Sequence, residues 1–426
     1  MTSRLLTLEN LDESTEAQEK QLKSILKRHQ KIFLGDGNAA RPPARGVICD
    51  LDVGDAKPVA QRPRTGGPHL AIKVYKLLKN LLEATLIEHS ESPWASLIVI
   101  VLKKNEVDIR LCIDYRVVNS FIQLSNYPLP LIDDLITGFE GMMWFMSFDM
   151  ASGFWAVRMT ERAKLISAFT CPFGHFQWKS DPQLPSDEMD AERSMPPLVE
   201  QMTVFRRNIP APSQMGSVLG SSSYIDVIAH GAATWDQLCG DLDALLYRLR
   251  YWSISVSLPK SEFGKRVIAY LSHEIGAEWI RSTPKIVKDI QELPFPSTMK
   301  GVQSFLGSLN YYHKFIEDYA VVAASLYELT DDHVRAGRHL SRAKESFAIL
   351  KRKIVSTPLP RHPDRTKPFV IIPHANQWAA CAVLGQMHDG LVQPVRFTGH
   401  VLSDAELKYH IAEKEVLAVM RVLHVF

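Results

Sequence analysis

Two aspartates in this sequence stand where a carboxylate could do chemistry. Asp149 ends an apolar run over residues 142–149, and Asp226 lies in the tetrapeptide YIDV. Carboxylates that converge from different strands can hold two divalent metal ions, which activate a hydroxyl and neutralise a triphosphate. Spacing alone does not select this chemistry, because aspartates at such places are more often solvated turn residues.

Apolar periodicity predicts the elements that would position these aspartates. Leucines and valines recur every three or four residues over 70–82, which predicts an amphipathic helix. Apolar runs at 97–102 and 109–114 flank a polar loop and predict a β-hairpin with a charged tip. Further helices are predicted over 233–252, 302–329 and 406–426, with strands near 254–258 and 267–272 and three short strands from 367 onward. The pattern is of mixed α and β type.

Two further stretches are less regular. Residues 15–34 have a loose helical period and are followed by many prolines and glycines, so that 1–68 are expected to form a lead-in helix and an extended linker. Residues 179–222 combine prolines, a charge cluster and a Gly-Ser tail, and are expected to be irregular.

Composition limits the class of protein. The 426 residues contain 49 Lys and Arg against 47 Asp and Glu, so a nucleic-acid partner would have to be bound by a local basic groove. The five cysteines are far apart, which argues against a zinc ribbon or a disulfide framework and favours an intracellular setting. The longest aliphatic run, 97–102, is too short to span a membrane, and the acidic start argues against secretion.

A series of segments resembles, in order, the polymerase of gypsy-like LTR retrotransposons. The segments are SPWASLIVIVLKK, IRLCIDYRVVN, NYPLPLIDDL, FMSFDMASGFW, YIDV, SLPKSEFGK, YLSHEIG, SFLGSLNYYHKFIEDYA, KPFVIIPHAN and AEKEVLAVM. The resemblance implies an α+β fold: a right-hand polymerase with fingers, palm and thumb, followed by a connection and a truncated RNase H-like α/β unit. It implies fingers and palm at 69–275, thumb and connection helices at 276–365, and the RNase H-like unit at 366–426.

The resemblance assigns roles to the two aspartates. Asp149 and Asp226 match the metal-binding catalytic aspartates, and Lys260 matches a lysine placed near the leaving pyrophosphate. The implied cofactor is Mg²⁺ or Mn²⁺, two ions per polymerase site. The second aspartate of the family pair is Val227 here, and a valine cannot bind a metal, so we expect an impaired enzyme.

Nucleotide-binding residues follow from the same resemblance. Arg110, with Lys103 or Lys104 on the hairpin tip, is similar to the triphosphate clamp. Phe154 resembles the steric gate that selects deoxynucleotides, although by residue type alone it is better explained as a core aromatic. Tyr224 belongs to the same nucleotide site.

Two blocks of the family pattern are altered in this sequence. The block that packs under the nucleotide is absent after Trp178, so that misfolding between 179 and 222 is expected. Ser272 replaces the glycine of the primer-gripping Leu-Gly-His turn, where a glycine conformation could be needed.

The RNase H-like stretch is also altered. His374 replaces the first catalytic aspartate, whereas Glu415 matches the glutamate of the following helix, and the sequence ends at Phe426 before the remaining aspartates. We therefore expect no RNase H activity.

These resemblances predict an RNA-directed DNA polymerase whose partners are an RNA template, a DNA primer and deoxynucleoside triphosphates, in the cytoplasm and in virus-like particles, with no membrane partner. One alternative is a catalytically dead remnant that still binds the template-primer duplex, which should weaken steeply with salt. Another is a decayed reading frame that never folds completely. The pairs Asp133-Asp134 and Asp331-Asp332 are explained by helix capping and solvation.

Overall fold

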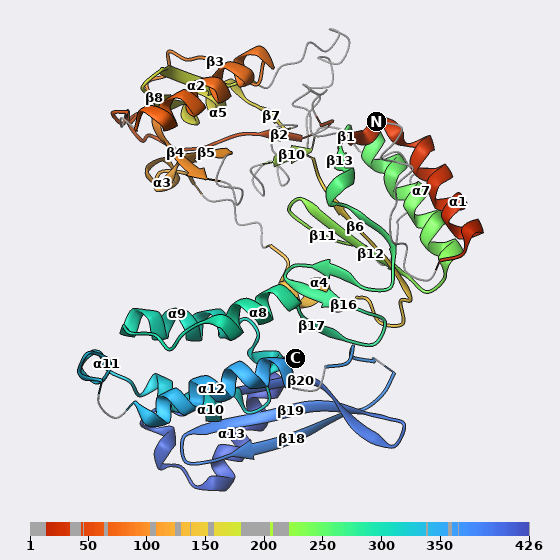
Figure 1. Cartoon of the computed structure of the whole chain (residues 1–426), viewed down its shortest axis with the longest axis vertical. Helices are drawn as coiled ribbons and strands as arrows, with labels where there is room; N and C mark the ends of the chain where they lie inside the picture. Colours follow the sequence, from red (N-terminus) through yellow and green to blue (C-terminus); the bar gives the residue numbers. More distant parts are fainter. Residues whose placement is uncertain are drawn as a thin grey trace.

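The computed structural model describes most of the chain. The described residues are 14–34, 44–45, 47–63, 67–102, 108–123, 129–136, 138–151, 157–179, 205–207, 221–337, 340–356, 360–364 and 366–425. Lys103, Lys104 and Phe154, and most of 179–222, therefore lie outside them. Helices and strands are segregated into several sheets and helical layers, which confirms the predicted α+β class (Figure 1). Within these ranges, no helix is both long and apolar enough to cross a membrane.

A sheet with the strand order β11-β12-β6-β14 forms the centre of the molecule (Figure 1). β6 (Trp144–Asp149) is antiparallel to β12 (Val227–Ala232) on one side and to β14 (Glu262–Lys265) on the other. β11 (Ser221–Tyr224) pairs with β12 through a tight turn. Every residue of β6 before Asp149 is buried, so packing on both faces fixes the strand that carries this aspartate.

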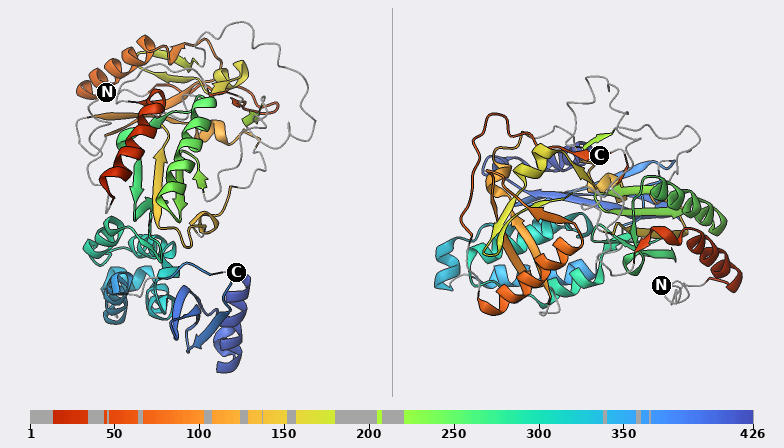
Figure 2. Two further views of the ribbon diagram at one scale, coloured as in Figure 1. Left: turned by 90° about the vertical axis from the view of Figure 1, so that its right-hand side faces the viewer. Right: turned by 90° about the horizontal axis from the view of Figure 1, so that it is seen from above.

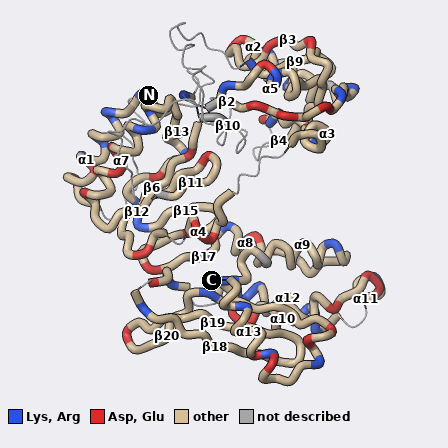
Figure 3. The backbone as a smooth tube through the Cα atoms, turned by 180° about the vertical axis from the view of Figure 1, so that it is seen from behind, with Lys and Arg blue, Asp and Glu red and all other residues tan. Residues whose placement is uncertain are grey.

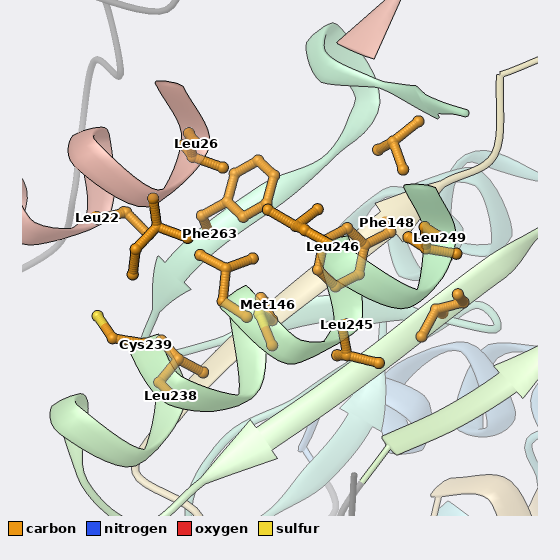
Figure 4. Close-up of a cluster of buried hydrophobic side chains, with 14 of the residues drawn as sticks. Leu22, Leu26, Met146, Phe148, Leu238, Cys239, Leu245, Leu246, Leu249 and Phe263 are labelled. Atoms are coloured by element: carbon orange, nitrogen blue, oxygen red, sulfur yellow. The ribbon is translucent and has the colours of Figure 1, made fainter. Parts of the chain in front are cut away.

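Two helices cover one face of this sheet. α7 (Trp235–Tyr251) and α1 (Glu16–Arg28) lie side by side, and Leu22 and Leu26 of α1 point into the same cluster as Met146 and Phe148 of the sheet (Figure 4). The chain then continues through the 3₁₀ turn η1 (Gln30–Ile32) into β1 (Phe33–Leu34), which pairs with β13 (Val256–Ser257). The predicted lead-in helix is thus part of the central core.

A second sheet, of strand order β3-β9-β8-β4-β5, carries the predicted hairpin. β4 (Ser96–Leu102) and β5 (Ile109–Asp114) are antiparallel partners, as the sequence predicted. α2 (Pro68–Glu83) buries Val74, Leu78 and Leu81 against this sheet. The remaining elements are β3 (Ile87–His89), α3 (Arg116–Asn119), α5 (Glu161–Ile166), β8 (Phe169–Cys171) and β9 (Gly174–Trp178).

The predicted linker contains a strand that the sequence did not predict. β2 (Val47–Cys49) lies between β10 (Phe205–Arg207) and β7 (Arg158–Met159) in a small sheet. The carboxylate of Asp50 then accepts hydrogen bonds from Thr160 at 2.6 Å and Arg162 at 2.5 Å. Proline and glycine spacing predicted an extended chain correctly, but periodicity within one segment carries no information about pairing with distant strands.

The predicted helix over 302–329 is wrong as a single element. It consists of α9 (Met299–Asn310), the 3₁₀ turn η5 (His313–Phe315) and α10 (Tyr319–Tyr327). Asp318 adopts a left-handed conformation with φ 53°, which an α-helix cannot continue. These helices pack with α12 in one apolar cluster. The neighbouring elements are β15 (Ile268–Tyr270), β16 (His273–Ile275), β17 (Ile280–Ser282), α8 (Pro284–Glu292), α11 (Asp331–Ala336) and α12 (Ser341–Ser356).

The last unit is a sheet of order β18-β19-β20, at the opposite end of the molecule from the β3-β9-β8-β4-β5 sheet (Figure 2). α13 packs on one face through Ala418 and Val422, and α10 packs on the other face through Ala320 against Cys381. The predicted strands and final helix are present, with a 3₁₀ turn before the helix. Their bounds are β18 (Phe369–Ala375), β19 (Ala379–His388), β20 (Leu391–Val401), η6 (Glu406–Lys408) and α13 (Ile411–Val425).

Asp133 does more than the predicted capping and solvation. It lies in the first turn of α4 (Ile132–Ile136), beneath the central sheet. Its carboxylate pairs with Lys314 of η5 and, at 3.0 Å, with Arg396 of β20. Asp133 thereby links the central sheet region, the helical layer and the last unit. By contrast, Asp331 and Asp332 lie in the first turn of α11, whose N-cap is Thr330.

Candidate active site

Asp149 is the last residue of β6, where the strand leaves the buried core. Its backbone N–H donates to the hydroxyl of Ser261 at 3.2 Å, and its side chain is 25% exposed. The next N–H, of Met150, donates to the carbonyl of Asp226 at 2.8 Å. A fully buried strand thus presents one carboxylate at the open end of the sheet.

Asp226 lies in the tight turn between β11 and β12. Tyr224 and Val227 are the last paired residues, which leaves Ile225 and Asp226 as a two-residue loop. Ile225 has φ 54° and is 59% exposed, a strained conformation for a β-branched residue and one that clusters at functional sites. The bond from Met150 to this turn places Asp226 next to the end of β6, so the structure brings the two predicted metal ligands together.

Val227 is the register partner of Asp149 across the β6 and β12 ladder. Because Met150 donates to Asp226, the pair formed by Asp149 and Val227 is of the non-hydrogen-bonded type. Side chains of such a pair lie on the same face with Cβ atoms about 4.5–5.5 Å apart. The isopropyl group of Val227 therefore stands beside the carboxylate of Asp149.

Lys260 supplies the positive charge at this end of the sheet. It ends the 3₁₀ turn η4 (Leu258–Lys260), and its Nζ lies 3.3 Å from Oδ1 of Asp149. The lysine side chain is 68% exposed, so the pair is accessible to an incoming anion. The structure therefore brings Asp149, Asp226 and Lys260 to one end of the sheet.

The donor set fits a magnesium ion held jointly with a substrate phosphate. Mg²⁺ in phosphoryl-transfer sites is bound through one or two carboxylates, with substrate oxygens and waters completing its shell. Asp149 and Asp226 provide such a pair. No group of three or more His, Cys, Asp or Glu side chains suited to a metal occurs within the part of the chain that the structure describes.

The predicted nucleotide-binding residues are only partly described. Arg110 is exposed on β5, opposite Val101, and belongs to a different sheet from Asp149. Tyr224 is half-buried at the end of β11. Lys103, Lys104 and Phe154 lie outside the described residues. The roles of these residues therefore stay predictions.

The turn that resembles the primer-gripping turn has the conformation of a glycine-containing turn. Ser272 adopts φ 66° and Leu271 φ 47°, so β15 and β16 are joined through two left-handed residues. His273 is buried against the rings of Tyr311 and Phe315, and this burial lowers its pKa to about 4. Ser272 therefore keeps the turn conformation expected of a glycine, at the cost of backbone strain.

The two matched RNase H-like residues lie on different elements. His374 is exposed on β18, and its neighbour Ala375 packs in the cluster beneath α13. Because strand neighbours alternate faces, His374 belongs to the face opposite α13. Glu415 is exposed on α13. An imidazole in place of a carboxylate, on that face, does not reproduce a two-carboxylate metal site.

Sequence reasoning missed Ser261 and the pairing of Val227 with Asp149. The only signal for Ser261 was its position next to the matched Lys260 in SLPKSEFGK. The register of β6 against β12 is a long-range relationship. The prediction that 179–222 is irregular was wrong for β10 and for the first two residues of β11, so the hairpin of β11 and β12 was not predicted.

Known proteins resemble this chain in sequence. The family described as "RNase H-like domain found in reverse transcriptase" matches residues 341–426. The chain is 27% identical over 419 residues to the retrovirus-related Pol polyprotein from transposon opus of Drosophila melanogaster, covering 94% of this chain and 40% of that protein. It is 28% identical over 361 residues to the Pol polyprotein from Drosophila transposon 297, covering 82% and 32%. The Schizosaccharomyces pombe transposon Tf2-3 polyprotein is 25% identical, covering 80% and 25%. The chain thus spans less than half the length of these relatives.

Solved structures show the same fold. The foamy viral protease-reverse transcriptase dRH in complex with double-stranded DNA superimposes with a TM-score of 0.80 at 19% identity, covering 99% of this chain and 71% of that one. The same kind of protein in complex with an RNA/DNA hybrid gives 0.77 at 20% identity, covering 99% and 55%. The fold is that of a right-hand polymerase followed by an RNase H-like unit.

These findings confirm the resemblance inferred from the sequence. The homologues of this chain are retrotransposon Pol polyproteins that contain a reverse transcriptase with an RNase H-like domain. A gypsy-like LTR retrotransposon reverse transcriptase with an RNase H-like domain fits them.

Proposed function

We propose that this chain is the polymerase part of a retrotransposon reverse transcriptase, with Asp149 and Asp226 as its metal ligands. The observation that carries the proposal is the bond from Met150 to Asp226, which ties the YIDV turn to the end of the strand that bears Asp149. Its relatives are Pol polyproteins, and the superimposed foamy viral proteins are complexes with double-stranded DNA and an RNA/DNA hybrid. The proposed partners are an RNA template, a DNA primer and deoxynucleoside triphosphates.

The residues of this chain would divide the work of nucleotidyl transfer. Divalent metal ions would activate the primer hydroxyl and neutralise the triphosphate. Asp149 and Asp226 would hold those ions, and Lys260 would lie next to the departing pyrophosphate, where a positioned ammonium can donate a proton. Arg110, Lys103 and Lys104 would bind the triphosphate, with Phe154 and Tyr224 lining the nucleotide site.

Val227 would impair this site. The side chain that stands beside Asp149 carries no charge, so the field that holds two cations is weakened by one carboxylate. The same feature favours a second candidate function, in which the chain binds a template-primer duplex without extending it. Lys and Arg recur along α12 (Figure 3), and the exposed Arg342, Lys344 and Arg352 would contact backbone phosphates.

Primer extension on an RNA template tests the proposal. We would compare the unmodified chain with Val227→Asp, first in Mg²⁺ and then in Mn²⁺. Extension by Val227→Asp, abolished by adding Asp149→Asn, is the expected result. Binding of an RNA/DNA hybrid that weakens with salt, without extension by either chain, would instead support the binding remnant.

The RNase H-like unit is proposed to be inactive in RNA cleavage. The imidazole of His374 offers a metal only nitrogen atoms, whereas Mg²⁺ prefers carboxylate oxygens. Incubation with a labelled RNA/DNA hybrid and Mg²⁺ should leave the RNA intact. Cleavage that disappears on Glu415→Gln would contradict this.

A further inference from the structure

The serine that follows Lys260 joins the two sides of the candidate site. The hydroxyl of Ser261 accepts a hydrogen bond from the N–H of Asp149 at 3.2 Å and donates one to the carbonyl of Ser257 at 2.8 Å. Its neighbour Lys260 carries the ammonium that lies 3.3 Å from Asp149. One side chain thus connects the strand end to the turn that presents the lysine.

The register of the sheet explains why a side chain is needed here. β14 pairs with β6 from Glu262 to Lys265, but the chain before Glu262 leaves the sheet in the turn η4. The N–H of Asp149 faces that side, because the alternate N–H of Met150 faces β12. Where a ladder carbonyl would stand in a longer strand, Asp149 has the hydroxyl of Ser261 instead.

We propose that Ser261 is a positioning residue, whose hydroxyl fixes Lys260 and the end of β6 in one geometry. The proposal rests on the proposed polymerase function and adds to it a residue that touches neither metal nor nucleotide. Without the hydroxyl, η4 would retain the backbone bond from the N–H of Ser261 to the carbonyl of Leu258. The lysine and the aspartate would then be joined only by an ion pair whose lysine is 68% exposed, and such a pair constrains geometry weakly.

Three variants test the proposal. Ser261→Ala removes the hydroxyl, and Ser261→Thr retains it at a backbone position, φ −100° and ψ 145°, that a β-branched residue adopts readily. Ser257→Ala is the matched control, since Ser257 contributes its backbone carbonyl, which alanine keeps. Each is made in the full chain, alone and together with Val227→Asp, and its thermal unfolding is measured first.

Two measurements are independent of activity. Amide exchange of Asp149 should become about fivefold faster in Ser261→Ala, because the donor loses its acceptor, and should be unchanged in the other two variants. Acylation of Lys260 by an amine reagent, measured against the exposed Lys288 as internal reference, should become about twofold faster in Ser261→Ala. Unchanged exchange and unchanged acylation would overturn the proposal.

The third measurement is kinetic. In the Val227→Asp chain, Ser261→Ala should lower kcat for primer extension about tenfold with KM for the nucleotide unchanged, and Ser261→Thr should restore it. A loss that Ser261→Thr does not restore, or that Ser257→Ala reproduces, would overturn the positioning role. Amide exchange and acylation could both become faster in Ser261→Ala while neither the unmodified chain nor the Val227→Asp chain extends a primer. That result would support the positioning of Lys260 and Asp149 by Ser261 and would overturn the proposed polymerase function.

Discussion

Val227 lies directly across the ladder from Asp149, as the non-hydrogen-bonded partner at the end of β6. This relationship makes position 227 a place on β12 from which a further carboxylate, in addition to Asp226, would face Asp149. Because the two side chains already lie on the same face, restoring the charge requires no change of backbone.

Val227→Asp should strengthen divalent metal binding. A third carboxylate, in addition to those of Asp149 and Asp226, raises the negative field at the site, so we expect the affinity for Mn²⁺ to rise about tenfold, a gain of about 1.4 kcal/mol. Without metal the variant should unfold about 1 kcal/mol more easily, because like charges then face each other across the ladder. Electron paramagnetic resonance titration measures the first effect and urea unfolding the second. Val227→Asn adds similar bulk without charge, and an equal gain in that control would contradict the argument.

Lys260→Ala should separate activity from stability. The lysine of the ion pair with Asp149 is 68% exposed, so its loss should change the free energy of unfolding by less than about 0.5 kcal/mol. If the lysine assists the leaving group, kcat of a Val227→Asp chain should fall about a hundredfold. Lys288, which pairs with Glu292 on the surface of α8, provides the control variant Lys288→Ala. Equal effects of the two variants on kcat would contradict the proposal that Lys260 assists the leaving group.

The linkage through Asp133 predicts a pH dependence of stability. Burial acts to raise the pKa of this carboxyl, but the hydrogen bond and charge of Lys314, together with Arg396, hold it below its usual range. An aspartate whose pKa is lower in the folded chain stabilises the fold above the unfolded value near 3.9, and this contribution is lost as the pH falls through the folded pKa. Urea unfolding between pH 7 and pH 3 should therefore show a steeper loss in the unmodified chain than in Asp133→Asn. Parallel pH profiles for the two chains would argue against the linkage.

Thr85→Gly should stabilise the protein. Thr85 follows the last turn of α2 with φ 55°, and the N–H of Leu86 bonds the carbonyl of Leu81 in the pattern that normally ends at a glycine. Glycine relieves the strain of a β-branched residue in the left-handed region, by about 1 kcal/mol. Ala84→Gly, one residue earlier at φ −76°, should be destabilising instead. Thermal unfolding of both variants gives the signs, and the same sign for both would show that strain at Thr85 is not the cause.

Leu26→Ala tests whether α1 belongs to the central core. Leu26 is fully buried in the cluster with Phe148, so truncating it should cost about 2–5 kcal/mol. Lys27→Ala on the outer face of the same helix should cost less than about 0.5 kcal/mol. Denaturant unfolding compares the two variants. A small effect of Leu26→Ala would show that α1 does not contribute to the stability of the central core.

The sequence predicted elements best where a local period was strong. The amphipathic stripe of 70–82 and the apolar runs of the 97–114 hairpin were found as α2, β4 and β5, because each buries one face in a way that leaves a period in the chain. The single helix expected over 302–329 failed at Asp318, since one left-handed residue breaks a helix without changing its hydrophobic pattern.

The sequence by itself indicated which proteins this chain is similar to and which groups to propose for its site: two aspartates, a lysine, and a valine at a position where the resemblance implies an acid. These follow from residue order, which does not depend on folding. Only the tertiary structure decided that Val227 faces Asp149, that Ser261 joins Asp149 to the turn of Lys260, and that α1 belongs to the core. Asp149 and Val227 are 78 positions apart in the sequence, and the residues of the other two contacts are farther apart. Such contacts depend on strand register and layer packing, which no local pattern encodes.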